Sequence, residues 1–186
     1  MAVEEPLYTV TLKEDPIEIR EYPALIAAEV SVSGERAVAI KTGFRMLASY
    51  IFGENTQQQR IAMTAPVIQA PAAQETIPMT APVIQTATED AWLIRFMMPR
   101  GYALETLPKP NDTRVGLILI PKTRFAVIRF SGMAKEAEIT QKTAELNGFI
   151  NLHSLTVAGL PSLARYNPPW TLWFMRRNEI MIPLHS

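Results

Sequence analysis

The sequence predicts an α+β domain of two ββαββ halves related by a pseudo-twofold axis, each with one long helix packed on curved antiparallel sheets. The first observation is a long-range repeat, in which Pro16–Gly34 resembles Thr113–Gly132. In both copies an alternating segment reaches a proline turn, a second apolar segment follows, and Ser-Gly precedes a helical periodicity. The second observation is that successive strands adjoin without crossover helices, which predicts antiparallel pairing. The halves (about 7–99 and 113–184) each bury too little surface to fold alone, so one domain over 1–186 is expected.

The first half begins with strands and continues into a helix. Ile17 and Ile19 alternate with polar residues, as in a half-buried strand. Ser33 is expected to cap a helix over Gly34–Phe52, with an acidic residue, Glu35, near its positive end. Apolar residues at three- and four-residue steps form its expected core stripe: Ala37, Ile40, Phe44, Leu47 and Ile51. Two extended stretches follow, the "MTAPV" region and Ala91–Pro99.

The second half repeats this order after a polar, proline-rich connector at Glu105–Thr113. Phe125 and Val127 alternate as strand residues, and Ser131 is the expected cap of the second helix, with Glu136 near its positive end. That helix is predicted over Met133–Leu152, with an inward face of Ile139, Leu146, Phe149 and Ile150. The two extended stretches that follow are Leu160–Tyr166 and Trp170–Leu184.

Composition excludes several classes of function. The 186 residues are 48% hydrophobic and 19% charged, which is typical of a globular chain. Eighteen basic residues balance eighteen acidic ones, so no net field attracts nucleic acid or anionic lipid. No cysteine is present, which excludes disulfides, thiolate metal sites and cysteine nucleophiles. The acidic start "MAVEEPLYTV" and the absence of a long apolar stretch predict a soluble, cytoplasmic protein without membrane insertion.

Residues of hydrolytic catalysis are almost absent from the sequence. The only histidines, His153 and His185, have no acidic partner at a metal-ligand spacing, so no metal site is expected. His153 ends a predicted helix, where the helix dipole favours a cation. Glu18 and Glu21 are three residues apart on a strand and therefore face opposite sides, which does not suit a catalytic carboxylate pair. No phosphate loop or nucleophile elbow occurs, and an enzymatic role is left uncertain.

A short repeat distinguishes the middle of the chain. Ile61–Gln69 and Ile77–Gln85 are identical at eight of nine positions, with Met63 and Met79 at the same place in each copy. Proline cannot donate to a sheet ladder, which predicts an edge or loop location for these segments. Methionine lines pockets for large apolar ligands, although a core role is the alternative. The second copy is interpreted as a hairpin extension, which is tolerated at low cost and is a candidate flap over a ligand.

Six phrases occur in a fixed order over nearly the whole chain: "AIKTGFRMLASYIFGEN", "RIAMTAPV", "FMMP", "LPKPNDTRV", "RFSG" and "ARYNPPWTLWFMRRNEIMIPL". In these phrases and their order the chain resembles the SOUL haem-binding protein family. The resemblance implies a distorted antiparallel barrel of two ββαββ halves, related to effector-binding domains of some bacterial regulators. It also implies binding of haem or a related tetrapyrrole, without implying a particular reaction.

The resemblance also implies where a ligand would lie. In one branch of the family a histidine has been proposed as the axial haem ligand, and the matching position here is Glu21. Another branch is thought to hold haem beside the first helix, through apolar contacts and basic residues near the propionates. The residues that match this second arrangement, or lie beside it by helical geometry, are Lys41, Phe44, Arg45, Ala48 and Tyr50. The alternative for Lys41 and Arg45 is an ordinary solvated helix face.

The closing "RRNE" phrase has two readings. Arg176 and Arg177 either lock the last strand through ion pairs and hydrogen bonds or bind an anion. Adjacent residues of a strand face opposite sides, which favours the structural role.

A haem or tetrapyrrole carrier, buffer or sensor is therefore the function that the sequence favours. The cofactor is haem b without an assigned axial ligand, and the expected site residues are Lys41, Phe44, Arg45, Ala48, Tyr50, Met63 and Met79. Two alternatives stay open. One is an effector-binding or interaction module for another large apolar ligand, and the other is an enzyme that uses bound haem or a buried carboxylate such as Glu21.

Overall fold

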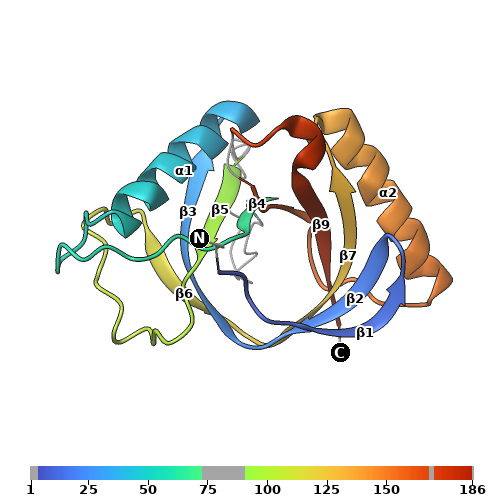
Figure 1. Cartoon of the computed structure of the whole chain (residues 1–186), viewed down its shortest axis with the longest axis horizontal. Helices are drawn as coiled ribbons and strands as arrows, with labels where there is room; N and C mark the ends of the chain where they lie inside the picture. Colours follow the sequence, from blue (N-terminus) through green and yellow to red (C-terminus); the bar gives the residue numbers. More distant parts are fainter. Residues whose placement is uncertain (1–3, 73–90, 168–169, 186) are drawn as a thin grey trace, which may run out of the picture.

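The fold is one curled antiparallel sheet with two helices on its outer face, in a computed structural model that describes residues 4–72, 91–167 and 170–185 (Figure 1). The strands are β1 (Thr9–Glu14), β2 (Ile17–Tyr22), β3 (Leu25–Ser33), β4 (Val67–Pro71), β5 (Ala91–Met97), β6 (Gly116–Ile120), β7 (Thr123–Ser131), β8 (Ser162–Arg165) and β9 (Arg177–Leu184). The helices are α1 (Arg36–Ile51), α2 (Glu136–Leu152) and the short 3-10 helix η1 (Trp173–Met175). The predicted α+β class with two long helices is confirmed.

The strand order carries the repeat of the sequence. The nine strands pair in the order β1-β2-β7-β9-β8-β4-β5-β3-β6, and every pair is antiparallel. In the two halves, β2 corresponds to β6, β3 to β7, β4 to β8 and β5 to β9. When β1 is left out and each strand is exchanged for its counterpart, the strand order read from the other end is unchanged. The first half contributes β2 to the sheet of the second, and the second contributes β6 to the sheet of the first. The edge strands β1 and β6 do not pair with each other, so the sheet is a half-barrel.

Each helix covers one half of the sheet and closes a hydrophobic core. Between α1 and β3 and β5 lies a core that includes Val30, Leu47 and Ile94. Between α2 and β2, β7 and β9 lies a second core that includes Leu146 and Ile182. A third, smaller apolar cluster lies on the inner face of the sheet. The sheet is therefore packed on both faces, and the two long helices of the described residues both lie on the outer one (Figure 1).

The helix starts differ from the predicted caps. Both Ser-Gly dipeptides precede a helix as predicted, but Ser33 and Ser131 are the last residues of β3 and β7 and cap nothing. Gly34 has a φ of 111°, a value that suits glycine and lets the chain turn out of the strand. Glu35 is the cap of α1, because its carboxylate accepts hydrogen bonds from the backbone N–H groups of Ala37 and Val38 at 3.0 and 3.1 Å.

The face of α1 that meets the sheet is rotated from the predicted stripe. Leu47 and Ile51 are buried as expected, whereas Ala37 and Phe44 are exposed. The buried residues are Ala39, Gly43, Leu47, Tyr50 and Ile51, mostly four residues apart. Hydrophobicity could not reveal this face, because it is centred on a glycine. A Cβ atom on Gly43 would lie 2.6 Å from Ile94 Cδ1 and 3.1 Å from Val30 Cγ1, so the missing side chain lets α1 approach the sheet.

Two glycine substitutions should therefore have opposite effects. Gly43→Ala forces α1 away from Ile94, and overpacking of about 1–3 kcal/mol should outweigh the helix-propensity gain of about 1 kcal/mol. Gly148→Ala on the exposed side of α2 meets nothing within 4 Å, so it should stabilise the fold by up to about 1 kcal/mol. Urea unfolding of both variants measures the difference. A stabilised Gly43→Ala variant would contradict the close approach of helix and sheet.

The strands differ from the prediction in two places. β1 precedes the predicted repeat and was not expected. The predicted strand Trp170–Leu184 becomes regular only at Arg177, because η1 occupies its first part.

The first copy of the short repeat matches the loop alternative in part. Residues 61–66 lie in the connection before β4, where the missing N–H of Pro66 costs no ladder bond. The rest of the copy lies in β4, which runs between β8 and β5 and is not an edge strand.

Candidate functional site

Four of the predicted site residues lie together on the outer side of α1. Lys41 and Arg45 are exposed, Ala48 is half-buried, and the Phe44 ring is 38% exposed. Phe44 packs edge-on against Phe96 of β5, with the ring centroids 5.2 Å apart. We call these four residues the α1 flank. Helical geometry places them on one continuous arc, so the structure brings together an aromatic ring, a small apolar residue and two cations.

Tyr50 does not belong to this surface. Its ring is buried, and its hydroxyl donates a hydrogen bond to the carbonyl oxygen of Pro108 at 2.8 Å. Burial, with a smaller contribution from Tyr102, raises the pKa of Tyr50 to about 12. The phenol is therefore neutral at physiological pH and supports the helix from within.

Of the two methionines of the short repeat, the structure describes one. Met63 is 39% exposed, just before β4. Met79 and the second copy of the repeat, including the suggested flap, lie outside the described residues.

Three arginines gather near the start of α1. Arg165 of β8 lies close enough to Arg36 and Arg176 for their positive charges to affect it. Burial first, and then these two charges, lower the pKa of Arg165, and its Nε is buried without a hydrogen-bond partner. The Arg36 guanidinium lies 5.4 Å from the centre of the Trp92 ring, and Arg176 donates to the Thr171 carbonyl at 2.8 Å. This arginine cluster is a source of positive charge beside α1.

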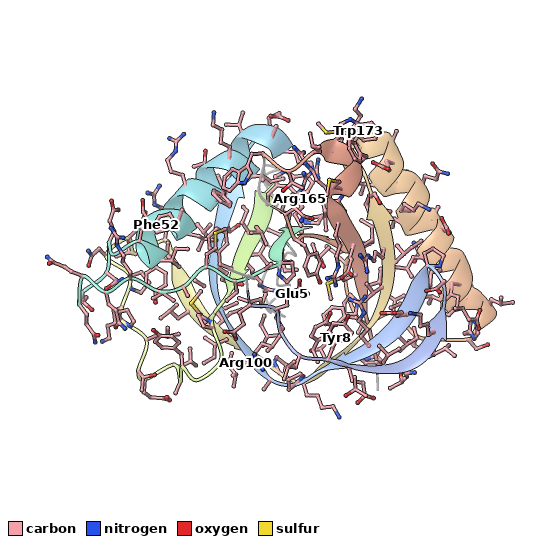
Figure 2. The ribbon with its side chains drawn as sticks, in the orientation of Figure 1. Glu5, Tyr8, Phe52, Arg100, Arg165 and Trp173 are labelled. Carbon is pink, nitrogen blue, oxygen red and sulfur yellow. The ribbon has the colours of Figure 1, made fainter. Side chains whose placement is uncertain are left out.

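An exposed apolar segment at 170–175 adjoins the arginine cluster through Arg176. Five of its six residues are large, apolar and more than half exposed: Trp170, Leu172, Trp173, Phe174 and Met175. Figure 2 shows Trp173 at the end of the molecule where the two long helices begin. Side chains of this size are seldom left in water together, and such patches mark binding surfaces.

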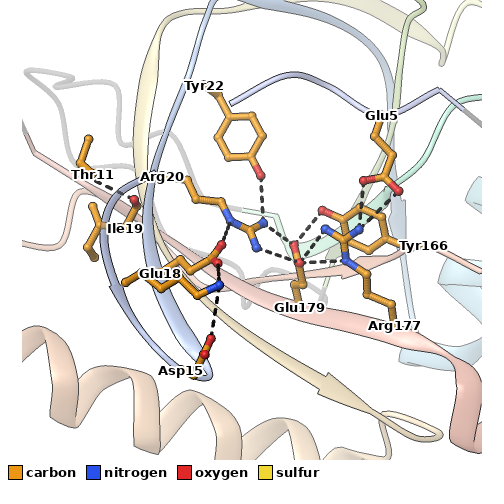
Figure 3. Close-up of polar contacts among 11 residues, drawn as sticks. Glu5, Thr11, Asp15, Glu18, Ile19, Arg20, Tyr22, Tyr166, Arg177 and Glu179 are labelled. Carbon is orange, nitrogen blue, oxygen red and sulfur yellow. Dashed lines mark hydrogen bonds and ion pairs between the residues drawn. The ribbon is translucent and has the colours of Figure 1, made fainter. Parts of the chain in front are cut away.

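A buried ionic cluster lies inside the half-barrel around Glu179 of β9, whose side chain is 0% exposed (Figure 3). Arg20 of β2 donates to both carboxylate oxygens, at 2.8 and 3.1 Å. Arg177 donates to Oε1 at 2.9 and 3.0 Å, and the Tyr166 hydroxyl donates to Oε2 at 2.7 Å. Arg177 also pairs with Glu5 at 3.0 Å, which ties the N-terminal segment to β9. The structural role favoured for "RRNE" fits these contacts, with the difference that Arg176 lies before the strand.

The charges of this cluster compensate one another. Burial would raise the pKa of Glu179, but the hydrogen bonds and charge of Arg20, helped by Tyr166 and Arg177, hold it below the ordinary value. Burial raises the pKa of Tyr22 to about 12 despite its hydrogen bond from Arg20. Because every member of the cluster is paired, we expect the cluster to stabilise the packing of the strands that carry it.

The carboxylate suggested for catalysis is placed differently from expectation. Glu21 is partly exposed and pairs with Lys122 at 3.1 Å, so it is not a buried acid. The buried acid is Glu179, which sequence reasoning treated only as part of the "RRNE" phrase.

The inner face of the sheet also encloses an apolar cavity of about 260 Å³, which we call the central hollow. It is lined by Pro6, Tyr22, Pro23, Leu25, Pro66, Ile68, Ala70, Arg95, Met97, Ile120, Pro121, Thr123, Phe125, Leu160, Ser162, Met181 and Pro183. Two more polar recesses lie beside the C-terminal half of α1, and both include Arg45.

The described residues were compared with the requirements of a metal site and of a membrane-spanning helix. Among residues 4–72, 91–167 and 170–185, no three histidine, cysteine, aspartate or glutamate side chains gather so as to hold a metal ion. None of the helices in that part of the chain has the length and apolar character needed to cross a membrane.

The chain is similar to known proteins in sequence and in fold. A family model described as SOUL heme-binding protein matches residues 3–183. A comparison with curated proteins finds no match. Among solved structures, the EcmrR C-terminal domain is similar with a TM-score of 0.64 and 12% identity, covering 97% of this chain and 99% of that one. A structure described as a hydrolase from Listeria innocua has a TM-score of 0.62 and 13% identity, covering 94% of each chain. At such identities these two structures show a shared fold alone.

Proposed function

The chain belongs to the SOUL heme-binding protein family, and from this premise we propose that it binds haem or a related tetrapyrrole against the α1 flank. The observation that carries the proposal is the family match over residues 3–183. Haem b is the form we expect, and carriage, buffering or sensing of haem is the role that such binding would serve.

The residues of the α1 flank fit such a ligand. The exposed Phe44 ring and the half-buried Ala48 offer apolar contact to a flat macrocycle. Lys41 and Arg45 are exposed on the same arc, where each can pair with a propionate carboxylate. The apolar segment at 170–175 and the arginine cluster supply further apolar surface and positive charge beside the start of α1.

Burial and propionate pairing are proposed to supply most of the affinity. The position of the family's proposed axial histidine is Glu21, and the Tyr50 hydroxyl is bound to Pro108. Of the predicted site residues within the described ranges, Met63 is the one with both exposure and a sulfur that haem iron accepts.

A haemin titration followed by visible spectra tests the proposal. We expect a Soret shift that saturates at one equivalent. The absence of any shift would overturn the proposal.

The histidines should not matter in this titration. His153 stacks on Phe149 with ring centroids 4.2 Å apart, and its Nε2 lies 3.3 Å from a Glu14 carboxylate oxygen, on the α2 side of the molecule. His185 is exposed near the C-terminal end. A variant with both histidines replaced by alanine should therefore give the same Soret band as the unaltered protein. Loss of the band would identify a histidine as the iron ligand, against the proposal.

A second candidate is a binding module for another large apolar molecule. The apolar segment at 170–175 favours it, because exposed tryptophan and phenylalanine rings accept many apolar partners. A protein that gives no Soret shift but binds an apolar dye through this segment would support that candidate.

A further inference from the structure

The central hollow lies on the opposite face of the sheet from the α1 flank. Strand alternation in β5 separates the two: Ile94 and Phe96 pack toward α1, whereas Arg95 and Met97 line the hollow. Both halves of the repeat contribute walls, and Pro6 of the N-terminal segment adds to the lining. The hollow therefore exists only in the assembled half-barrel.

The lining specifies an apolar ligand of modest size. Aliphatic, proline and aromatic side chains make most of the wall, including Leu25, Ile68, Phe125 and Met181. The volume of about 260 Å³ lies just below the range of about 300–1,000 Å³ that is usual for pockets of drug-sized ligands. A compact molecule thus suits the hollow better than a macrocycle.

Arg95 gives the hollow its polar specificity. Among the described residues that line the cavity it is the one with a formal charge, and its side chain is 30% exposed. Its Nε donates to Glu29 at 2.7 Å, which fixes the guanidinium, while its terminal nitrogens have no hydrogen-bond partner in the described ranges. Glu29 itself is not among the lining residues. A guanidinium held in this way can receive a second carboxylate through its remaining N–H groups.

We propose that the central hollow binds a compact apolar carboxylate, of the class of medium-chain fatty acids, with its carboxylate on Arg95 and its apolar part between the two halves. The site is independent of haem binding. Decanoate is the probe, with decanol and decylamine as neutral and cationic comparisons.

Methionine methyl signals in NMR spectra report the location of binding. Decanoate should shift the signals of Met97 and Met181, which line the hollow, and leave that of Met63 unchanged. Decanol and decylamine should bind at least about tenfold more weakly, because a charge-assisted hydrogen bond to Arg95 is lost. Unshifted Met97 and Met181 signals, or equal affinity for decanol, would overturn the proposal.

Substitutions separate this site from others. Arg95→Met should weaken decanoate binding by about tenfold or more, and Ala70→Phe should weaken it by filling the hollow. Arg100→Met is the matched control, since Arg100 is exposed outside the hollow and should leave affinity unchanged. Lys41→Glu with Arg45→Glu should also leave decanoate affinity unchanged, so a failure of the haem proposal is distinguishable from a failure of this one. If Ala70→Phe does not fold, Arg95→Met alone decides, and undiminished binding in that variant contradicts the proposal.

Discussion

Replacing Glu179 by glutamine should lower the free energy of unfolding by about 3–5 kcal/mol, because the change removes the fully buried carboxylate that Arg20 and Arg177 share and leaves them only the more exposed Glu18 and Glu5. Arg20 is almost fully buried, and its guanidinium makes two hydrogen bonds to Glu179. Arg177 loses the same partner. Since native domains are stable by only about 5–15 kcal/mol, this is a large fraction of the total. Urea unfolding at neutral pH measures it.

The matched control is Glu21→Gln, which removes an acid from a partly exposed pair with Lys122. Pairs of this kind contribute about 0–1 kcal/mol, so the control should change stability little. An equal decrease in the free energy of unfolding in the two variants would show that the Glu179 cluster does not stabilise the fold as its geometry indicates.

The same cluster predicts how stability depends on pH. The pKa of Glu179 is lower in the folded protein than its ordinary value of 4.5, because the contributions of Arg20, Tyr166 and Arg177 outweigh the effect of burial. A lowered pKa means that the stabilisation is fully present above the unfolded-state pKa and is lost as pH falls through the folded-state pKa. Stability should therefore decline on acidification below about pH 4.5, and the Glu179→Gln variant should lack the part of that decline that Glu179 contributes.

Charge reversal on the α1 flank should have the largest effect on function. Lys41→Glu together with Arg45→Glu should weaken haemin binding by about a hundredfold or more, because two charge-assisted contacts of about 1.5–3 kcal/mol each become repulsive. Both side chains are exposed, so the fold should be unaffected. Haemin titration at fixed ionic strength gives the ratio of affinities.

A control must carry the same change of net charge. Lys13→Glu with Lys122→Glu reverses two lysines whose own side chains are exposed and that both lie away from α1. Haemin affinity should then change only by the small, long-range effect of the altered net charge of the protein. If this control weakens binding as strongly as the α1 variant, the propionates do not rest on the α1 flank.

Local sequence patterns predicted the elements of the fold well. The repeated proline turn and Ser-Gly dipeptide located both long helices to within three residues of their observed starts and ends, as expected for strongly periodic segments. The face of α1 was missed because a glycine, Gly43, marks the closest approach to the sheet, and glycine carries no hydrophobic signal. The exposed Phe44 was therefore assigned to the core as well as to the ligand site.

Long-range contacts explain what could not be predicted. Glu179 meets Arg20 from a point 159 residues away along the chain, and no local spacing records that pairing. The central hollow likewise takes its walls from both halves. On the α1 flank, the resemblance to the SOUL family suggested Lys41 and Phe44, and helical geometry added Arg45 and Ala48.

Locating a bound tetrapyrrole tests the proposed haem site on α1 most directly. Zinc protoporphyrin, which is diamagnetic, can be titrated into labelled protein while backbone amide signals are followed by NMR. We predict saturable shifts at one equivalent that concentrate in residues 37–48 and 170–175, with the concave face little changed. Shifts confined to the residues around Met97 and Met181, or no shifts at all, would contradict a haem site on α1.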